Sequence, residues 1–250
     1  MNPTACLIII GNEILSGRTQ DKNLNHLALT LNERGVQLRE ARVVPDVEDE
    51  IIAAVNACRA KYTYVFTTGG IGPTHDDITS ASVARAFGVP IHRHPEAERI
   101  LRAHYTEDQI NEARLKMADV PLGAELIDNP VSSAPGYKMG NVYVFAGVPR
   151  IMHAMLDAVK HTLAEGTPVQ TLSITCDLGE GAIAEGLTAI QSRYPQVEIG
   201  SYPYFKQGVL STTLVMRSTD ATANKAAYDA VAEMIGRLGG TQMDDPTKAA

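Results

Sequence analysis

The residues best suited to chemistry lie in a glycine-rich loop at positions 69–77, which follows a short apolar run. Its three glycines carry no side chains that would hold a ligand away, so backbone N–H groups can face an anion directly. Asp76 and Asp77 close the loop with hard oxygen ligands for a divalent cation. The pattern favours a site that holds a phosphate and its metal, with phosphate contacts from Thr68, Gly69, Gly70, Gly72, Pro73 and Thr74.

An ordinary glycine turn is the alternative for the same residues. In that case Asp77 caps the helix that apolar spacing predicts over residues 78–87, and the loop binds nothing. Three glycines, a Pro-Thr pair and two adjacent aspartates together favour a binding site over a plain turn.

Two further loops carry carboxylates. Residues 12–23 follow an apolar run and contain Glu13 and Asp21, and Asp46 follows the next apolar run. If these runs are parallel strands, the carboxylates lie at their carboxyl ends, where open α/β sheets bind ligands. The residues also allow a simpler interpretation, in which Asp21 and Asp46 cap the helices that follow and Glu13 is a solvated loop charge.

Hydrophobic spacing predicts the elements that position these loops. Apolar runs indicate strands at residues 6–10, 36–44 and 62–68, and helical spacing indicates helices over 24–35, 47–60 and 78–87. Three strand–helix units in sequence predict an α/β fold with a mostly parallel, three-layer arrangement and right-handed crossovers. The carboxylates of the three loops should therefore meet at one edge of the sheet.

The segment after the third unit is charged and has helical spacing. It predicts helices over residues 96–105 and 107–118. His92-Arg93-His94 precedes them, but no third ligand accompanies the two histidines. A solvated turn is therefore preferred to a metal site there.

A hairpin and a helix follow. Gly140-Asn141 is a turn pair and predicts a hairpin over residues 137–145. Pro149 suits the first turn of the helix expected over 151–165. The free N–H groups at this helix start make a second possible anion site, together with Gly147.

A second, smaller domain is expected beyond a Gly-Thr-Pro linker, which divides the chain into domains 1–166 and 167–250. Its elements are predicted at residues 169–176, 181–193, 197–202, 208–217 and 221–238, in the order βαββα. This order indicates a small α+β domain. Residues 179–184 fit a G-x-G-x-x-A fingerprint, but one βα unit cannot build a dinucleotide fold, so we assign them to a helix start. Residues 239–250 have the composition of a disordered tail.

The charge balance argues against a general surface for polyanions. The formal charge is −7 and the pI about 5.5, so nucleic acid is not expected as a partner. Cys6, Cys58 and Cys176 are far apart and form no C-x-x-C, which predicts neither a disulfide framework nor a zinc cluster. No stretch has the length of a membrane span or the pattern of a signal peptide, so a cytoplasmic protein without membrane contact is expected.

Residues from about 6 to 165 resemble the MoaB/Mog molybdopterin-binding fold, most closely the amino-terminal domain of the CinA family, competence/damage-inducible protein A. The resemblance rests on five segments in the family's order: GNEILSGRTQDKN at 11–23, Val44-Pro45-Asp46, the loop 69–79, Ala134-Pro135-Gly136-Tyr137 and Gly147-Val148-Pro149. Two positions depart from it. Ala146 stands where the family usually has proline, and Ile151 stands where CinA proteins usually carry glutamate, which removes one carboxylate.

The carboxyl-terminal part resembles the small KH-like domain that follows this module in CinA proteins. It has no basic GxxG clamp, so RNA binding is not carried over. The deamidase domain of a full-length CinA has no counterpart in this sequence, and deamidation of nicotinamide mononucleotide is not expected.

The resemblance implies a metal-dependent nucleotide pyrophosphatase, a hydrolase that acts on phosphoric anhydrides, with ADP-ribose or a related dinucleotide as substrate. It implies Asp46 and Asp77 as catalytic residues. The implied cofactor is Mg²⁺, Mn²⁺ or Co²⁺, held by Glu13, Asp21, Asp76 and Asp77. Beyond the glycine loop, ligand contacts are implied for Gly11, Asn12, Ser16, Gly17, Gly136, Gly147 and Pro149.

Two alternatives accompany this hypothesis. One is a molybdopterin-binding or molybdopterin adenylyltransferase-like protein of molybdenum cofactor metabolism, with molybdopterin itself as the ligand. The other is a non-catalytic nucleotide-binding module whose site has decayed, for which Ile151 is the best support. All three take a small-molecule nucleotide or pterin as partner, and a homo-oligomer is expected.

Overall fold

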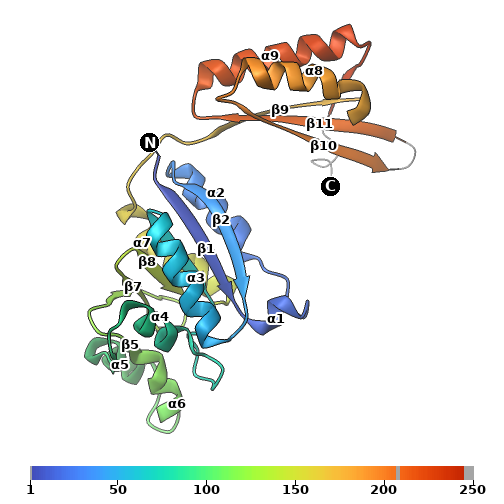
Figure 1. The fold of residues 1–250 in the computed structure, drawn as a ribbon. Helices are drawn as coiled ribbons and strands as arrows, with labels where there is room; N and C mark the ends of the chain where they lie inside the picture. The colour runs from blue at the N-terminus through green and yellow to red at the C-terminus, as the bar shows by residue number, and fades with distance from the viewer. Residues whose placement is uncertain (1, 207–208, 245–250) are drawn as a thin grey trace. The chain divides into compact units, whose positions relative to one another are not determined.

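The computed structural model describes residues 2–206 and 209–244, with helices and strands labelled in Figure 1. The chain separates into two compact units, Met1–Thr167 and Pro168–Ala250, and the boundary expected after residue 166 lies one residue earlier. No helix in the described residues is long and apolar enough to cross a bilayer.

The first unit is built on a six-stranded, mostly parallel sheet, which confirms the predicted fold class. The strand order is β2-β1-β3-β8-β7-β6; the first four strands are parallel, and β7 pairs antiparallel with both of its neighbours, β8 and β6. The strands are β1 (Thr4–Ile10), β2 (Gln37–Val44), β3 (Tyr64–Thr68), β6 (Glu125–Ile127), β7 (Gly136–Met139) and β8 (Val142–Phe145). The loops after β1, β2 and β3 therefore leave the sheet at the same edge.

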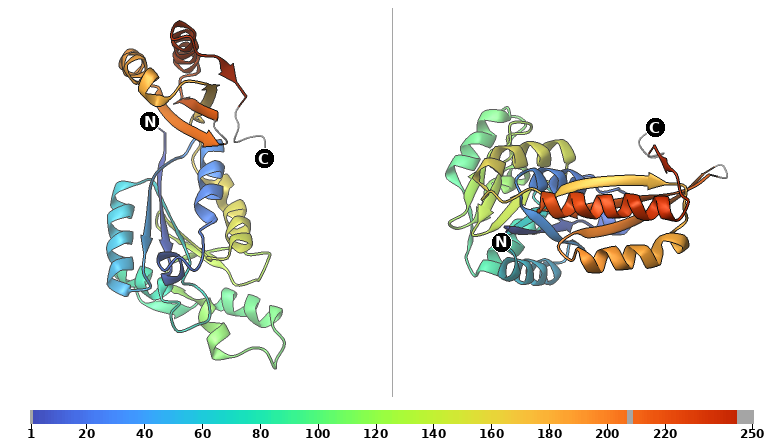
Figure 2. Two further views of the ribbon diagram at one scale, coloured as in Figure 1. Left: turned by 90° about the vertical axis from the view of Figure 1, so that its right-hand side faces the viewer. Right: turned by 90° about the horizontal axis from the view of Figure 1, so that it is seen from above.

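Helices cover both faces of this sheet, because the side chains of β1 alternate between two cores. Cys6 and Ile8 point into the core beneath α3 and α4. Leu7 and Ile9 point into the core beneath α2 and α7. Figure 2 shows α3 on one side of the sheet and α2 and α7 on the other. The helices are α2 (Asn23–Glu33), α3 (Glu48–Lys61), α4 (Thr79–Phe87) and α7 (Pro149–Val159), which continues into the 3-10 helix η2 (Lys160–Thr162).

The charged segment between α4 and β6 differs in two respects from its prediction. His92 does not lie in a solvated turn, because β4 (Ile91–Arg93) pairs with β5 (Asp119–Pro121). His94 caps α5 (Pro95–His104), since its Nδ1 accepts a hydrogen bond from the backbone N–H of Glu96. The second helix is shorter than expected and consists of α6 (Glu112–Leu115) and the 3-10 helix η1 (Lys116–Ala118).

The second unit has an antiparallel sheet in the order β10-β11-β9-β12, with α8 and α9 on one face (Figure 1). Its elements are β9 (Gln170–Cys176), α8 (Glu180–Arg193), β10 (Glu198–Lys206), β11 (Val209–Ser218), α9 (Ala221–Arg237) and β12 (Gln242–Met243). Gly179 precedes α8 as its N-cap, so the glycine fingerprint is a helix start, as predicted. The prediction of a disordered tail over residues 239–250 was wrong for β12, which pairs with β9. Residues 245–250 lie outside the described residues.

Candidate functional site

Asp46 joins the loops that follow β1 and β2. Its Oδ2 accepts a hydrogen bond of 2.9 Å from the backbone N–H of Asn12, and Gly11 N–H donates to the Val44 carbonyl at 3.2 Å. The predicted capping of α3 by Asp46 was wrong, because the N-cap is Val47 and no side chain caps this helix. Asp46 instead fixes the start of α1 (Asn12–Leu15), a short helix that the sequence analysis did not predict.

The glycine loop packs against the first loop through backbone atoms. Gly69 has a φ of 101°, and a Cβ at this position would lie 2.2 Å from the Ile10 carbonyl oxygen. A Cβ on Gly147 would lie 3.2 Å from the Cα of Gly69. The chain segments after β1, β3 and β8 therefore come together here only because two of them have glycine at the contact.

Asp77 closes the tip of the glycine loop. Its Oδ2 accepts hydrogen bonds from Thr74, from the backbone N–H at 2.8 Å and from the hydroxyl at 2.6 Å. The alternative interpretation, in which Asp77 caps α4, does not hold, because the N-cap is Ile78, without a side-chain bond. Lys116 donates to the Thr74 carbonyl at 2.6 Å and adds a positive charge beside the loop.

A small pocket of about 50 Å³ opens where the loop after β1, the end of β3 and the start of α7 meet. Five of the predicted site residues line it: Glu13, Asp21, Thr68, Gly147 and Pro149. Further polar lining comes from Thr19, Gln20, Lys22 and Asn23. The pocket is small but can hold a compact group such as a phosphate.

Two buried polar atoms at this pocket have no hydrogen-bond partner within the described part of the chain. Asn23 is 4% exposed; its Nδ2 donates to the Gly147 carbonyl at 2.8 Å, and its Oδ1 is unpaired. Thr68 is 1% exposed and its hydroxyl is unpaired. Buried polar groups are nearly always paired, so these two atoms mark a place where a ligand can supply the missing bonds.

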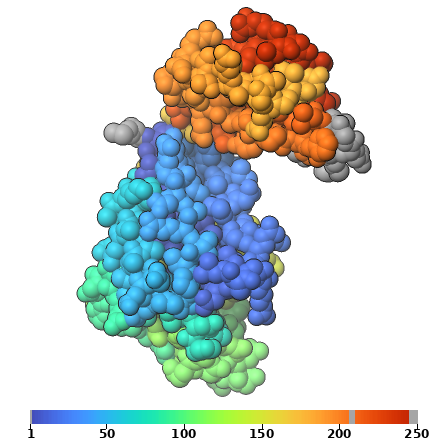
Figure 3. Space-filling view, turned by 45° about the vertical axis from the view of Figure 1, so that its right-hand side comes forward, coloured from blue at the N-terminus to red at the C-terminus, as the bar shows by residue number. Residues whose placement is uncertain are grey.

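Asp21 lies one residue before Lys22, which is the N-cap of α2. The Oδ2 of Asp21 accepts a hydrogen bond of 2.9 Å from Leu24 N–H in the first turn of α2, as a capping residue does, and Asp21 also lines the pocket. Glu13 stands on exposed α1 with its carboxylate folded over Gly11. The loop around α1, dark blue in Figure 3, lies on the surface of the first unit.

The remaining predicted residues lie outside the pocket lining. Gly136 is buried in β7, where a Cβ would lie 2.5 Å from the Val144 carbonyl oxygen. Ser16 donates to the Glu13 carbonyl at 3.3 Å in the exposed first loop. The others are Gly11, Asn12, Gly17, Gly69, Gly70, Gly72, Pro73, Thr74, Asp46, Asp76 and Asp77.

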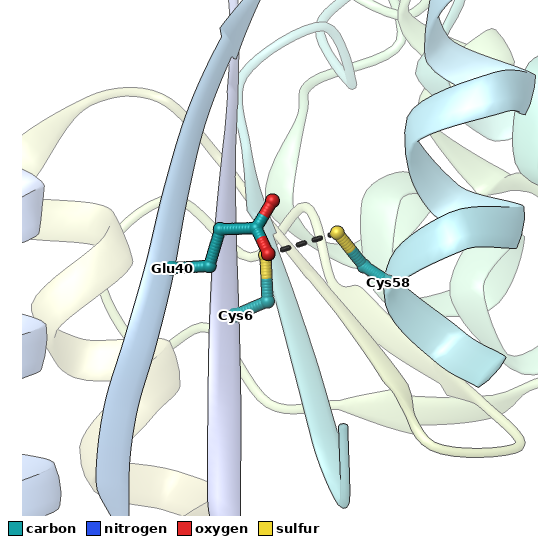
Figure 4. A group of neighbouring side chains, drawn as sticks. All are labelled: Cys6, Glu40 and Cys58. Carbon is teal, nitrogen blue, oxygen red and sulfur yellow. Dashed lines mark hydrogen bonds between the residues drawn. The ribbon is translucent and has the colours of Figure 1, made fainter. Parts of the chain in front are cut away.

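The five predicted carboxylates do not form a closed metal cage. Across the described residues, the one group of three potential ligands whose donor atoms all lie within 4.8 Å of one another is Cys6, Glu40 and Cys58 (Figure 4). Sequence reasoning missed this cluster, because its members come from β1, β2 and α3 and share no spacing motif.

Comparison with protein families finds two matches along the chain. Residues 6–165 match the family described as "Probable molybdopterin binding domain". Residues 168–238 match the family described as "FAD synthase, middle domain". The two matches coincide with the two units of the structure.

Individual relatives match in the same way. A protein of Pyrobaculum calidifontis is 35% identical over 212 residues, which cover 80% of this chain and 81% of that protein. A "Probable FAD synthase" of Caenorhabditis briggsae is 30% identical over 258 residues and covers 93% of this chain; the chain spans about half of that relative's length, 49%. The crystal structure of CinA from Thermoplasma acidophilum is 34% identical, with a TM-score of 0.61 over 64% of this chain and 98% of that one.

Proposed function

This chain belongs to the family of the probable molybdopterin binding domain, and we propose that its pocket binds the phosphate end of a pterin or nucleotide, with molybdopterin as the first ligand to test. The unpaired hydroxyl of Thr68 and the unpaired Oδ1 of Asn23 carry this proposal. A phosphate group brings acceptor oxygens for the hydroxyl, and a ligand hydroxyl or N–H donates to the amide oxygen.

The start of α7 supports the same ligand chemistry. Pro149 lines the pocket at the amino end of this helix, where the helix dipole favours a negative group. Lys22 adds a positive side chain to the lining. Because the pocket is small, the ring system of the ligand would extend beyond it along the neighbouring loops.

A binding titration tests this proposal. Isothermal titration of the full chain with molybdopterin, ADP-ribose, FAD and inorganic phosphate should give saturable binding of at least one organic ligand, with inorganic phosphate as a weak competitor. Saturable binding that phosphate leaves unchanged would show that the phosphate end lies elsewhere. The absence of binding by every compound would refute the proposed ligand class.

A metal-dependent pyrophosphatase is the second candidate, and the carboxylates of Glu13 and Asp21 favour it. They line the same pocket as the groups that favour an anion, so a phosphate bound there needs a cation to offset their charge. Mg²⁺ binds through one or two carboxylates together with substrate phosphates, and this donor set fits that mode without a closed cage. The metal would polarise the phosphoryl group that is attacked.

The protein's own residues would position the reacting groups in this candidate. Glu13 and Asp21 would hold the metal in the pocket. The glycine loop, which ends in Asp76 and Asp77, would face the part of the ligand that extends beyond the pocket. Asp46 retains one carboxylate oxygen besides the one that accepts from Asn12. The FAD synthase match adds FAD to ADP-ribose as a dinucleotide worth testing.

Product analysis separates the two candidates. The full chain is incubated with ADP-ribose or FAD and Mg²⁺, Mn²⁺ or Co²⁺, and AMP is measured by chromatography. Metal-dependent AMP release supports the pyrophosphatase. If the chain binds the ligand but releases no AMP with any of the three metals, it is a ligand-binding module.

A further inference from the structure

Two buried cysteines from different elements meet in the core of the first unit. Cys6 lies on β1 and Cys58 on α3, and their sulfur atoms are 3.0 Å apart although 52 positions separate them in the sequence (Figure 4). Both residues are 0% exposed and both are free thiols. We infer that Cys6 and Cys58 form an oxidisable dithiol that a peroxide closes to a disulfide.

The distance between the sulfur atoms favours a disulfide over a metal site. A disulfide needs about 2 Å between them, so the pair must close by about 1 Å. Two thiolates on a tetrahedral zinc lie about 3.8 Å apart, as follows from the zinc–sulfur bond length of about 2.3 Å, so a metal would push this pair apart.

Glu40, the third member of the cluster, is already committed to other partners. One carboxylate oxygen accepts from Arg42 at 2.5 Å, and the other accepts from Lys61 at 3.0 Å and from the Tyr62 hydroxyl at 2.5 Å. A metal would have to displace these bonds and sit beside two cationic side chains. The dithiol requires neither change.

The surroundings distinguish the two sulfur atoms. The pKa of Cys58 is lowered by the hydrogen bond from the Cys6 thiol and by the positive charges of Arg42 and Lys61. The pKa of Cys6 is raised by the same hydrogen bond and by burial. The lowered pKa favours Cys58 as the thiolate that attacks, with Cys6 as the thiol that resolves the intermediate; the disulfide is the same whichever sulfur attacks.

The chemistry balances with hydrogen peroxide as the oxidant. The Cys58 thiolate attacks one peroxide oxygen, and the O–O bond breaks. Hydroxide is released, and Cys58 becomes a sulfenic acid. The Cys6 sulfur then attacks the Cys58 sulfur, the S–O bond breaks, and the Cys6 proton leaves with the oxygen as water. The hydroxide takes up the proton that Cys58 lost on ionisation, so two thiols and one peroxide give one disulfide and two waters.

The small size of peroxide is essential, because the thiols are buried. The side chain of Glu40, 24% exposed, reaches from the cluster toward solvent. A bulky oxidant such as a glutathione disulfide should react far more slowly than peroxide with the folded protein. The resulting link joins β1 to α3 and constrains the unfolded chain across a long loop.

Peptide mapping tests the inference on the unmodified full chain. Reduced protein is exposed to hydrogen peroxide, unfolded in the presence of an alkylating agent, and digested. The expected product is a linked pair of peptides that contain Cys6 and Cys58, lighter by two hydrogen atoms than the sum of the separate peptides. Both cysteines recovered in alkylated form, or Cys58 recovered only as sulfinic acid, would overturn the inference.

Thermal unfolding gives a second measurement. Peroxide should raise the melting temperature of the wild type by roughly 5–15 °C, as expected for a loop-closing disulfide. Cys176→Ala, which removes a buried thiol of the second unit, should keep this rise, and Cys58→Ala should lose it. An equal rise in Cys58→Ala would overturn the inference; if that variant fails to fold, the peptide map of the wild type decides.

Discussion

The side-chain amide of Asn23 donates a hydrogen bond of 2.8 Å to the carbonyl of Gly147 and so joins the start of α2 to the loop before α7. The two chain segments lie far apart in sequence, yet both line the pocket. Asn23 is buried, and its amide oxygen has no hydrogen-bond partner within the described residues. The same residue therefore stabilises the pocket and offers it an acceptor.

Replacement of Asn23 by alanine should affect stability and binding together. The Gly147 carbonyl loses its partner in a buried place, which costs about 1–3 kcal/mol of unfolding free energy, measured by urea denaturation. Ligand affinity should fall in the same variant. Asn224→Ala is the matched control, because Asn224 is also buried and donates to a carbonyl, that of Gln170, in the second unit. This control variant should lower the unfolding free energy without changing the affinity for the ligand.

Replacement of Thr68 by valine should weaken binding without loss of stability. The hydroxyl is unpaired, so its removal should leave the unfolding free energy unchanged or raise it by up to about 1 kcal/mol. Ligand affinity should fall by roughly tenfold, one hydrogen bond's worth. Thr67→Val is the control, since Thr67 also has a buried unpaired hydroxyl but does not line the pocket. Equal affinities for the two variants would remove Thr68 from the site.

Replacement of Gly69 by alanine should strongly destabilise the folded protein. Its φ of 101° is strained for alanine, and the new Cβ would stand 2.2 Å from the Ile10 carbonyl oxygen. We expect a cost of roughly 3 kcal/mol or more in thermal or urea unfolding. Gly17→Ala also has a positive φ, 73°, but nothing lies within 4 Å of its Cβ, so about 1 kcal/mol is expected. Similar costs at both positions would mean that the loops can separate.

Replacement of Asp77 by asparagine tests the catalytic assignment. The amide oxygen can still accept from Thr74, so the unfolding free energy should change by less than about 1 kcal/mol. If the pyrophosphatase proposal holds, AMP release should fall by roughly a hundredfold or more, because a charged group at the reaction is lost. Asp108→Asn alters a comparable Asp–Thr hydrogen bond at an exposed turn and should keep full turnover. If Asp77→Asn keeps wild-type turnover, Asp77 is not a catalytic residue.

Glu40 should make the first unit sensitive to acid. Hydrogen bonds from Tyr62, Arg42 and Lys61 lower the pKa of Glu40 from 4.5 to about 2. The pKa of Glu40 is lower in the folded protein than in the unfolded chain. The ionised carboxylate therefore stabilises the folded state fully above about pH 4.5, and this stabilisation is lost as the pH falls toward 2.

The variant Glu40→Gln should accordingly be less stable than the wild type at neutral pH, and its unfolding free energy should fall less between pH 4.5 and pH 2. Urea denaturation at a series of pH values measures both effects. Glu125→Gln removes an exposed carboxylate that pairs with Lys138 at 3.4 Å, and its profile should follow the wild type. A Glu40→Gln profile parallel to the wild type would contradict the assignment.

The parallel strands β1, β2 and β3 and the helices that follow them could be predicted from the sequence alone. The apolar runs around Ile8 and Phe66 are continuous because parallel strands are buried on both faces, and this local pattern is readable without any contact information. The loop positions of Glu13 and Asp21 followed from the same argument, since strand ends in a parallel sheet share an edge. Asn23 and Thr68 belong to segments with recognisable sequence motifs, although nothing in those motifs showed that their polar atoms are unpaired.

Contacts between atoms that are distant in the sequence depend on how the elements pack. Asp46 stands before a helix, where capping is the local expectation, but packing brings it to Asn12, the start of another loop. Thr67 and Thr68 are neighbours of one type, and the strand's two-residue period sends only Thr68 to the pocket. Cys6 and Cys58 meet because β1 and α3 pack in one particular register, and register depends on the whole core, which no local pattern encodes.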